Sequence, residues 1–381
     1  MVVLARIARA AGADAPGNGV LIGGCGLAGP TGGPEAAPMP PSICVCLGSA
    51  SDALRLAPVV HELRRRDARH VVVAAGRPSR MLDDMLATFA IAPDIDLRSV
   101  ARREAAGTAL GGALAFARPG AVVLAAGTAT ALCAAPAAYS RGIPVAQIGG
   151  NRPAAPSACE GERRLLAHLA TWHFAPDEAG RAALVADGVG AAAIEVTGSL
   201  VAQAVRGIAE RDGLLARRTL AGPRRVLVAL RRGAGRDDAD RATGGMVARL
   251  AERADVEIAI AAPWSPLLRD DVAAHENVRL LGCPRYASFV AALAASDLLL
   301  SDAADALEAA GALGVTTVDA GDPALAGRAA ERALDDDALH RPLQLVPGTV
   351  AEDGAAARIV ARVARGRSAA IADPHSAKLA A

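Results

Sequence analysis

The chain has 381 residues, of which 52% are hydrophobic and only 2% aromatic, and its 41 basic residues balance 40 acidic residues to a net charge of +1. High hydrophobicity with low net charge excludes an intrinsically disordered chain. The same balance argues against a nucleic-acid-binding protein, because neutralising several phosphates takes a basic face. A chain of this length predicts about two domains with sizeable cores.

Two further features of composition bear on function. Lys378 is the only lysine, and roughly a quarter of the residues are alanine, which leaves little polar material for an active site. The cysteines contain no C-x-x-C pair, and Cys44 and Cys46 should point to one face of a strand. We therefore expect reduced, mostly buried thiols in a cytoplasmic protein, with no metal and no cofactor.

The first segment, residues 1–41, contains an apparent dinucleotide fingerprint, in which Val20–Ile22 is followed by Gly24-x-Gly26-x-x-Gly29. That fingerprint functions only where a helix opens behind it and presents free N–H groups to a pyrophosphate. Pro30 and Pro34 oppose such a helix. We interpret residues 1–41 as a disordered extension rich in alanine, glycine and proline.

Short apolar strands then alternate with amphipathic helices. The uncharged stretch Pro119–Ser140 divides into a strand and a helix, so we predict no membrane span there. In the first block we predict strands at Ile43–Leu47, His70–Ala75, Ala121–Ala125, Pro144–Ile148 and Ile194–Thr197, and helices at Asp52–Arg66, Pro78–Phe89 and Thr128–Tyr139.

A second block of strands follows, again with helices between them. The predicted strands are Arg225–Ala229, Val256–Ala261, Val278–Leu281, Asp297–Leu300 and Val315–Val318. This alternation is typical of parallel sheets covered by helices on both faces. We predict an α/β protein with two Rossmann-like domains, residues 42–205 and 206–366, facing a cleft, and a flexible tail at residues 367–381.

Several segments resemble one known family. Leu47–Val60 is similar to a pattern G-T-R-P-E-x-x-K-x-A-P, and Met81–Leu97 matches M-L-D-x-x-L-x-x-F-x-I-x-P-D-x-D-L almost position for position. His173–Glu178 and Pro284–Leu293 fit as well. These segments resemble the non-hydrolysing UDP-N-acetylglucosamine 2-epimerases over about residues 43–365.

The resemblance implies the GT-B fold, in which two Rossmann-like domains with parallel sheets face a central cleft. It also implies a homodimer formed through the first domain, and a reaction that removes the C2 proton of the sugar and expels UDP by elimination. Such chemistry needs acid or base groups at the sugar and cationic groups at the diphosphate.

Most positions that carry this chemistry in the family hold other residues here. By the resemblance, the catalytic aspartate position is Gly127, two carboxylate positions are Gly149 and Cys159, and a histidine position is Arg231. Glu160 is the one matching carboxylate candidate. Arg163 matches too, and the two residues are expected to form an exposed ion pair at a helix start.

The nucleotide-binding motif is also altered. The family's D-S-G-G-x-x-E-E reads Asp302-Ala-Ala-Asp-Ala-Leu-Glu-Ala309, so Asp305 stands where an anion approaches. Glu308 and Phe289 still match, the latter at an aromatic position beside the uracil ring. Arg231 and Arg232 follow a strand end and offer guanidinium groups for a phosphate, or form a solvated loop.

These observations leave several functions open. The first is a catalytically degenerate homologue, a pseudoenzyme that binds a nucleotide sugar weakly or acts as a partner or regulator in a glycan or sugar pathway. The second is a divergent active epimerase, or another GT-B enzyme acting on sugar nucleotides. A homodimer, or a complex with a related enzyme, is compatible with each, and neither needs a nucleic acid or a membrane.

Overall fold

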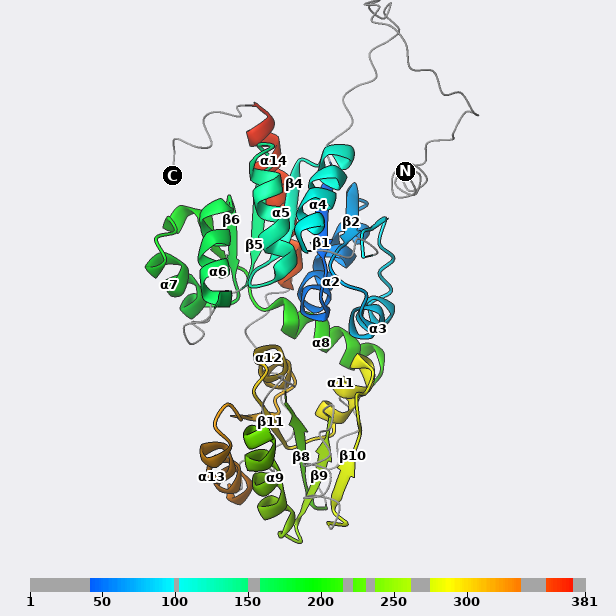
Figure 1. Ribbon diagram of the computed structural model, residues 1–381, viewed down its shortest axis with the longest axis vertical. Helices are drawn as coiled ribbons and strands as arrows, with labels where there is room; N and C mark the ends of the chain where they lie inside the picture. The colour runs from blue at the N-terminus through cyan, green and yellow to red at the C-terminus, as the bar shows by residue number, and fades with distance from the viewer. Residues whose placement is uncertain are drawn as a thin grey trace, which may run out of the picture.

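The computed structural model describes residues 42–98, 103–149, 158–214, 222–230, 237–261, 275–336 and 354–372. Within them lie two fully parallel sheets, of seven and five strands. Helix α8, Leu200–Arg211, lies across the junction between the two sheets (Figure 1). The predicted α/β class with two parallel sheets is therefore confirmed.

The first sheet has the strand order β3-β2-β1-β4-β5-β6-β7. Because the order reverses between β1 and β4, the loops after these two strands diverge and leave a crevice at the carboxyl edge of the sheet. The strands are β1 Ile43–Leu47, β2 His70–Ala74, β3 Ile95–Asp96, β4 Ala121–Ala125, β5 Val145–Ile148, β6 Trp172–Ala175 and β7 Ile194–Val196.

Helices cover both faces of this sheet, as the nearly continuous apolar strands require. Along β1, Ile43, Val45 and Leu47 join one core cluster while Cys44 and Cys46 join the other, because neighbouring side chains point to opposite faces. The helices are α2 Ala50–Arg65, α3 Arg80–Thr88, α4 Arg103–Ala117, α5 Ala129–Tyr139, α6 Ala158–Leu169 and α7 Glu178–Ala186, with a 3₁₀ turn at Ala191–Ala193.

The second sheet repeats the pattern in the order β10-β9-β8-β11-β12, with its own reversal between β8 and β11. Its strands are β8 Arg224–Ala229, β9 Val256–Ile260, β10 Val278–Leu280, β11 Leu298–Ser301 and β12 Thr316–Asp319. Its helices are α9 Asp237–Ala251, α11 Tyr286–Ala294, α12 Ala304–Ala312 and α13 Pro323–Asp335.

Two helices join the halves. Helix α8 packs on α2 of the first half and on α11 and α12 of the second, and α14, Gly354–Ala372, packs on α2 and α8. One core cluster accordingly contains Leu56 of α2, Val205 of α8, Ala309 of α12 and Ile359 of α14. The predicted domain limit at residues 205 and 206 falls inside α8, so the chain passes between the sheets within a helix.

The predicted strands agree with the structure to within a residue or two, and Pro119–Ser140 divides into β4 and α5 as expected. Within the described ranges, no helix is long and apolar enough to cross a membrane. The predicted extension, residues 1–41, lies outside the described residues, as does the tail beyond Ala372, whereas α14 continues through residues 367–372.

Candidate functional site

The strand-order reversals of the two sheets, between β1 and β4 and between β8 and β11, both lie at the junction of the two domains. Helix α2 begins just after β1 and helix α12 begins just after β11, so each opens at the reversal of its own sheet. Ligands of open parallel sheets bind in the crevice at such reversals. The polar groups between α2 and α12 are therefore the candidate site.

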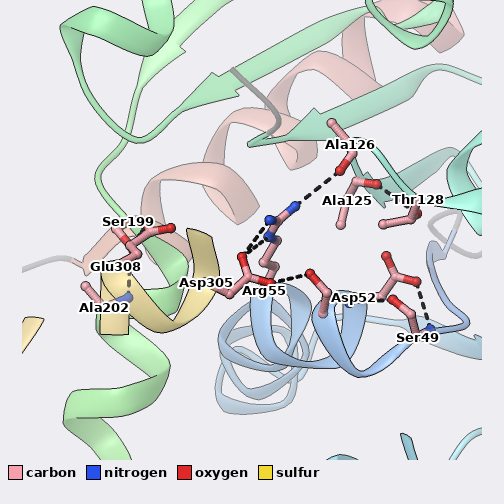
Figure 2. A network of polar contacts seen from close by, with 11 residues as sticks. Ser49, Asp52, Arg55, Ala125, Ala126, Thr128, Ser199, Ala202, Asp305 and Glu308 are labelled. Atoms are coloured by element: carbon pink, nitrogen blue, oxygen red, sulfur yellow. Dashed lines mark hydrogen bonds and ion pairs between the residues drawn. The ribbon is translucent and has the colours of Figure 1, made fainter. Parts of the chain in front are cut away.

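An ion pair spans this site (Figure 2). The guanidinium of Arg55, on α2, donates to Asp305 Oδ1 through NH2 at 2.6 Å and through Nε at 3.2 Å. Its NH1 donates to the carbonyl oxygen of Ala126, just past β4, at 3.2 Å. Ser51 Oγ donates to Asp305 Oδ2 at 2.5 Å, so both carboxylate oxygens accept from the first domain.

Burial alone would lower the pKa of Arg55. The charge of Asp305 and the hydrogen bonds to it outweigh that effect, and the pKa of Arg55 is raised. The arginine therefore stays charged, and the pair is a charge-assisted contact in a partly desolvated place, with both side chains about one-quarter exposed (21% and 24%).

A second contact between the halves lies beside the first. Ser199, the N-cap of α8, accepts from the N–H of Ala202 at 2.8 Å and donates to Glu308 Oε1. Burial raises the pKa of Glu308, the charges of Asp305 and Asp177 add to this, and the Ser199 hydrogen bond and Arg55 oppose it. Glu308, predicted as a nucleotide contact, is thus committed to a hydroxyl of the first half.

Asp52 lies close by but serves its own helix. Its Oδ2 accepts from the backbone N–H of Gly48 at 2.9 Å and of Ser49 at 3.0 Å, while Ser49 Oγ accepts from the N–H of Asp52 at 3.1 Å. This reciprocal capping box explains why α2 begins here. Burial raises the pKa of Asp52 against these hydrogen bonds.

Within the described residues, the ends of β4 and β5 present backbone and no charged side chain. Gly127 and Gly149 follow these strands with φ of +75° and +66°, a region that glycine enters at little cost. Thr128 Oγ1 accepts from the N–H of Ala131 at 3.2 Å and so caps α5. The two neighbouring strand ends therefore carry no acid or base at these positions.

Aromatic rings line the α3–α11 side of the site. Tyr286 lies between Phe89 and Phe289, with ring centroids 6.3 Å and 5.9 Å away. The backbone N–H of Tyr286 donates to Asp84 Oδ2 at 2.6 Å, so a carboxylate on α3 caps α11, whose own N-cap Arg285 makes no side-chain cap bond. Phe289 is half-buried in this row.

The other predicted residues have different outcomes. Arg231 and Arg232 lie outside the described residues, and Glu160 lies on α6 with its side chain outside them. Arg163 is buried and forms an ion pair with Asp187, so its expected place in an exposed pair is wrong. The guanidinium instead reaches the carboxylate of Asp187, the C-cap residue of α7.

Sequence reasoning missed Arg55, Ser199 and Asp84. Arg55 occupies the lysine position of the family pattern over Leu47–Val60, and that cation was the available signal. Nothing local marked Ser199 or Asp84, because their partners are more than a hundred residues away in sequence. Among the described residues, no cluster of three or more histidine, cysteine or acidic side chains is arranged to hold a metal ion.

Comparison of the sequence with known proteins finds one matching family and several relatives. The family model described as UDP-N-acetylglucosamine 2-epimerase matches residues 61–324. A probable UDP-N-acetylglucosamine 2-epimerase of Ralstonia nicotianae is 28% identical over 363 residues, covering 83% of this chain and 97% of the relative. The enzyme of Escherichia coli K12 is 29% identical over 338 residues, covering 81% of this chain and 85% of its own length.

A solved structure shows the same fold. The UDP-GlcNAc 2-epimerase of Neisseria meningitidis, bound to UDP-GlcNAc, aligns with a TM-score of 0.72 at 21% identity, over 85% of this chain and all of that one. The GT-B arrangement of two Rossmann-like domains about a cleft, expected from the resemblance, is confirmed.

Proposed function

The chain belongs to the UDP-N-acetylglucosamine 2-epimerase family, and from this premise we propose that it has kept the scaffold without the ordinary epimerisation. In this proposal it is a pseudoenzyme that binds a nucleotide sugar weakly, or serves as partner or regulator of another enzyme in a glycan or sugar pathway. The observation that carries the proposal is that Gly127 follows β4 and Gly149 follows β5, where the family has carboxylates.

Epimerisation at C2 needs groups that remove a proton from one face of the sugar and return it to the other. Gly127 and Gly149 stand at two carboxylate positions by the family pattern, and each has a left-handed backbone that no ordinary side chain adopts cheaply. Losing one acid or base typically costs about two to four powers of ten in rate. Losing several removes the ordinary reaction.

In this proposal the cleft still binds a nucleotide weakly, although it no longer catalyses epimerisation. The proposed contacts are Arg231 and Arg232 for a phosphate, Phe289 for the uracil ring, and Glu308, which is the neighbour of the family's ribose-holding position, here Ala309. The Neisseria meningitidis relative holds UDP-GlcNAc, which supports this ligand class. Glu308 must leave Ser199 to contact a nucleotide, and the charge of Asp305 acts on it, so the affinity for a nucleotide should be low.

The proposed assembly is a homodimer, or a complex with a related enzyme, through the first domain. Helices α4, α5 and α6 pack in a row, and each exposes one large apolar side chain, Phe116, Tyr139 and Leu165, at 45%, 50% and 46%. Association through this row would cover all three. A cytoplasmic location belongs to the same proposal, and the thiols of Cys44, Cys46, Cys133 and Cys283 are free.

The test is a product assay with UDP-GlcNAc, in which the Escherichia coli relative serves as positive control. We expect no UDP-N-acetylmannosamine from this chain under conditions where the control reaches equilibrium. Formation of product at a comparable rate would instead establish the divergent active epimerase. A thermal-shift titration with UDP separates binding from a purely structural role, since a ligand specific for the native state raises its stability.

A further inference from the structure

The carboxylate of Asp305 occupies a place built for an anion. It receives two hydrogen bonds from the Arg55 guanidinium and one from the Ser51 hydroxyl, all from the other domain. It also lies in the first turn of α12, where the N-cap Ala303 contributes no side-chain acceptor. The positive end of the helix dipole therefore adds to the attraction of Arg55.

The site also holds a polar group that these contacts do not use. The hydroxyl of Tyr286 is buried and has no hydrogen-bond partner. Burial raises the pKa of Tyr286, and the charges of Asp305 and Glu308 raise it further, so the hydroxyl lies within electrostatic range of both carboxylates. A buried hydroxyl donor that has no hydrogen-bond partner and lies within electrostatic range of Asp305 is a group that an anion larger than a carboxylate would engage.

We propose that Asp305 is an internal anion that determines the specificity of the cleft by occupying Arg55 and Ser51 in place of the diphosphate of a nucleotide. This inference rests on the proposed function, because it takes the cleft to be where such a ligand binds. In the intact chain, Asp305 holds the two domains together without any ligand and weakens the binding of diphosphates. Removing its charge frees the donors and makes the cleft an anion site.

Two physical effects favour the tethered carboxylate over a free diphosphate. Its effective concentration at Arg55 is on the order of millimolar or higher, because it belongs to the same chain. A diphosphate entering beside it would also meet the charges of Asp305 and Glu308 within a partly desolvated site, where like charges repel more strongly than in water. Removing the charge of Asp305 should therefore strengthen the binding of a diphosphate about tenfold or more.

The experiment titrates inorganic pyrophosphate, and separately UDP, into the full chain and its variants by calorimetry. Asp305→Ala and Asp305→Asn should each bind pyrophosphate at least about tenfold more tightly than the parent chain. The control Glu252→Ala removes the same charge from an exposed position past α9, and should bind as the parent does. The double variant Arg55→Ala with Asp305→Ala should lose the gain.

Equal affinity of the parent chain and both Asp305 variants would overturn the inference, as would a gain that survives the loss of Arg55. Melting curves report which variants fold. If Asp305→Ala does not fold, the comparison rests on Asp305→Asn, which keeps the shape of the side chain. The titration does not depend on turnover. Failure of the proposed function would appear separately, as product formed by the parent chain.

Discussion

The two domains meet at one cleft but hold their polar groups there in different ways. On the first-domain side, Asp52 caps its own helix and Thr128 caps α5, so both are held by neighbouring backbone. On the second-domain side, the carboxylates of Asp305 and Glu308 are held by Arg55, Ser51 and Ser199 from across the cleft.

This difference has a consequence for stability. The first domain caps α2 and α5 with its own local contacts, whereas Asp305 and Glu308 of the second domain take their partners from the first. A cleft whose groups satisfy one another has little free chemistry left for a substrate. Each of the following substitutions tests one side of this contrast.

The largest effect is expected from Ile208→Ala in α8, the helix shared by both domains. Ile208 is 2% exposed and belongs to the core cluster that joins α2, α8 and α12. The lost contacts and the cavity should cost about 2–5 kcal/mol of unfolding free energy. Chemical denaturation, followed by hydrogen exchange in each sheet, should show both domains weakened, while loss confined to one domain would contradict the shared core.

The next effect is acid destabilisation of the first domain through His173 on β6. Burial lowers the pKa of His173 from 6.5 to about 4, opposed by a hydrogen bond with the Ala170 backbone. Between pH 6.5 and 4, His173 is therefore protonated in the unfolded chain but neutral in the folded chain. Stability from this group is present above pH 6.5 and is lost as the pH falls toward 4, by up to about 3 kcal/mol.

The measurement is the unfolding free energy across that pH range for the parent chain and His173→Gln. The variant should have lower stability at neutral pH but a flatter slope between pH 6.5 and 4. Parallel slopes would show that His173 does not titrate in the folded chain as described.

A smaller effect is expected from Gly48→Ala, just past β1. A Cβ at this position would lie 2.1 Å from Thr130 Oγ1 and 2.9 Å from the Ala75 carbonyl oxygen, so the turn must shift. We expect a loss of about 1–3 kcal/mol, as for overpacking elsewhere. The control Gly112→Ala, in α4 with no atom within 4 Å of the added Cβ, should gain about 0.5–1 kcal/mol.

The smallest effect compares the two kinds of cap. Asp84→Ala removes a cap supplied across the cleft to α11, and Thr128→Ala removes a cap within the first domain. Each substitution should lower the free energy of unfolding by about 1 kcal/mol. Hydrogen exchange should then speed up at the start of α11 in the Asp84 variant and at the start of α5 in the Thr128 variant. Unchanged exchange in α11 would show that the second domain does not need the first there.

The sequence predicts the strands well because buried parallel strands are short continuous apolar runs bounded by turns, as at Ile43–Leu47 and Ala121–Ala125. Helices α4 and α7 and strands β3 and β6 were not predicted, and of α6 only a helix start near Glu160 and Arg163 was expected. In α4, the apolar residues run around the helix with little periodicity, and alanine and glycine blur the pattern.

The site was harder to predict than the fold. Thr128 as a cap follows from local rules, but the Arg55–Asp305 and Ser199–Glu308 contacts join residues separated by 250 and 109 positions. Each residue alone looks like a solvated charge or an ordinary cap. Only the packing of α8 against both α2 and α12 brings these residues together into a site.

The central claim is that the scaffold persists without the C2 proton chemistry. The most direct measurement incubates the chain with UDP-GlcNAc in heavy water and follows the C2 position by NMR, which detects proton removal even without net epimerisation. We predict that the C2 proton signal keeps its full intensity and that no deuterium enters. Deuterium at C2 at a rate near that of the Escherichia coli relative would contradict the account.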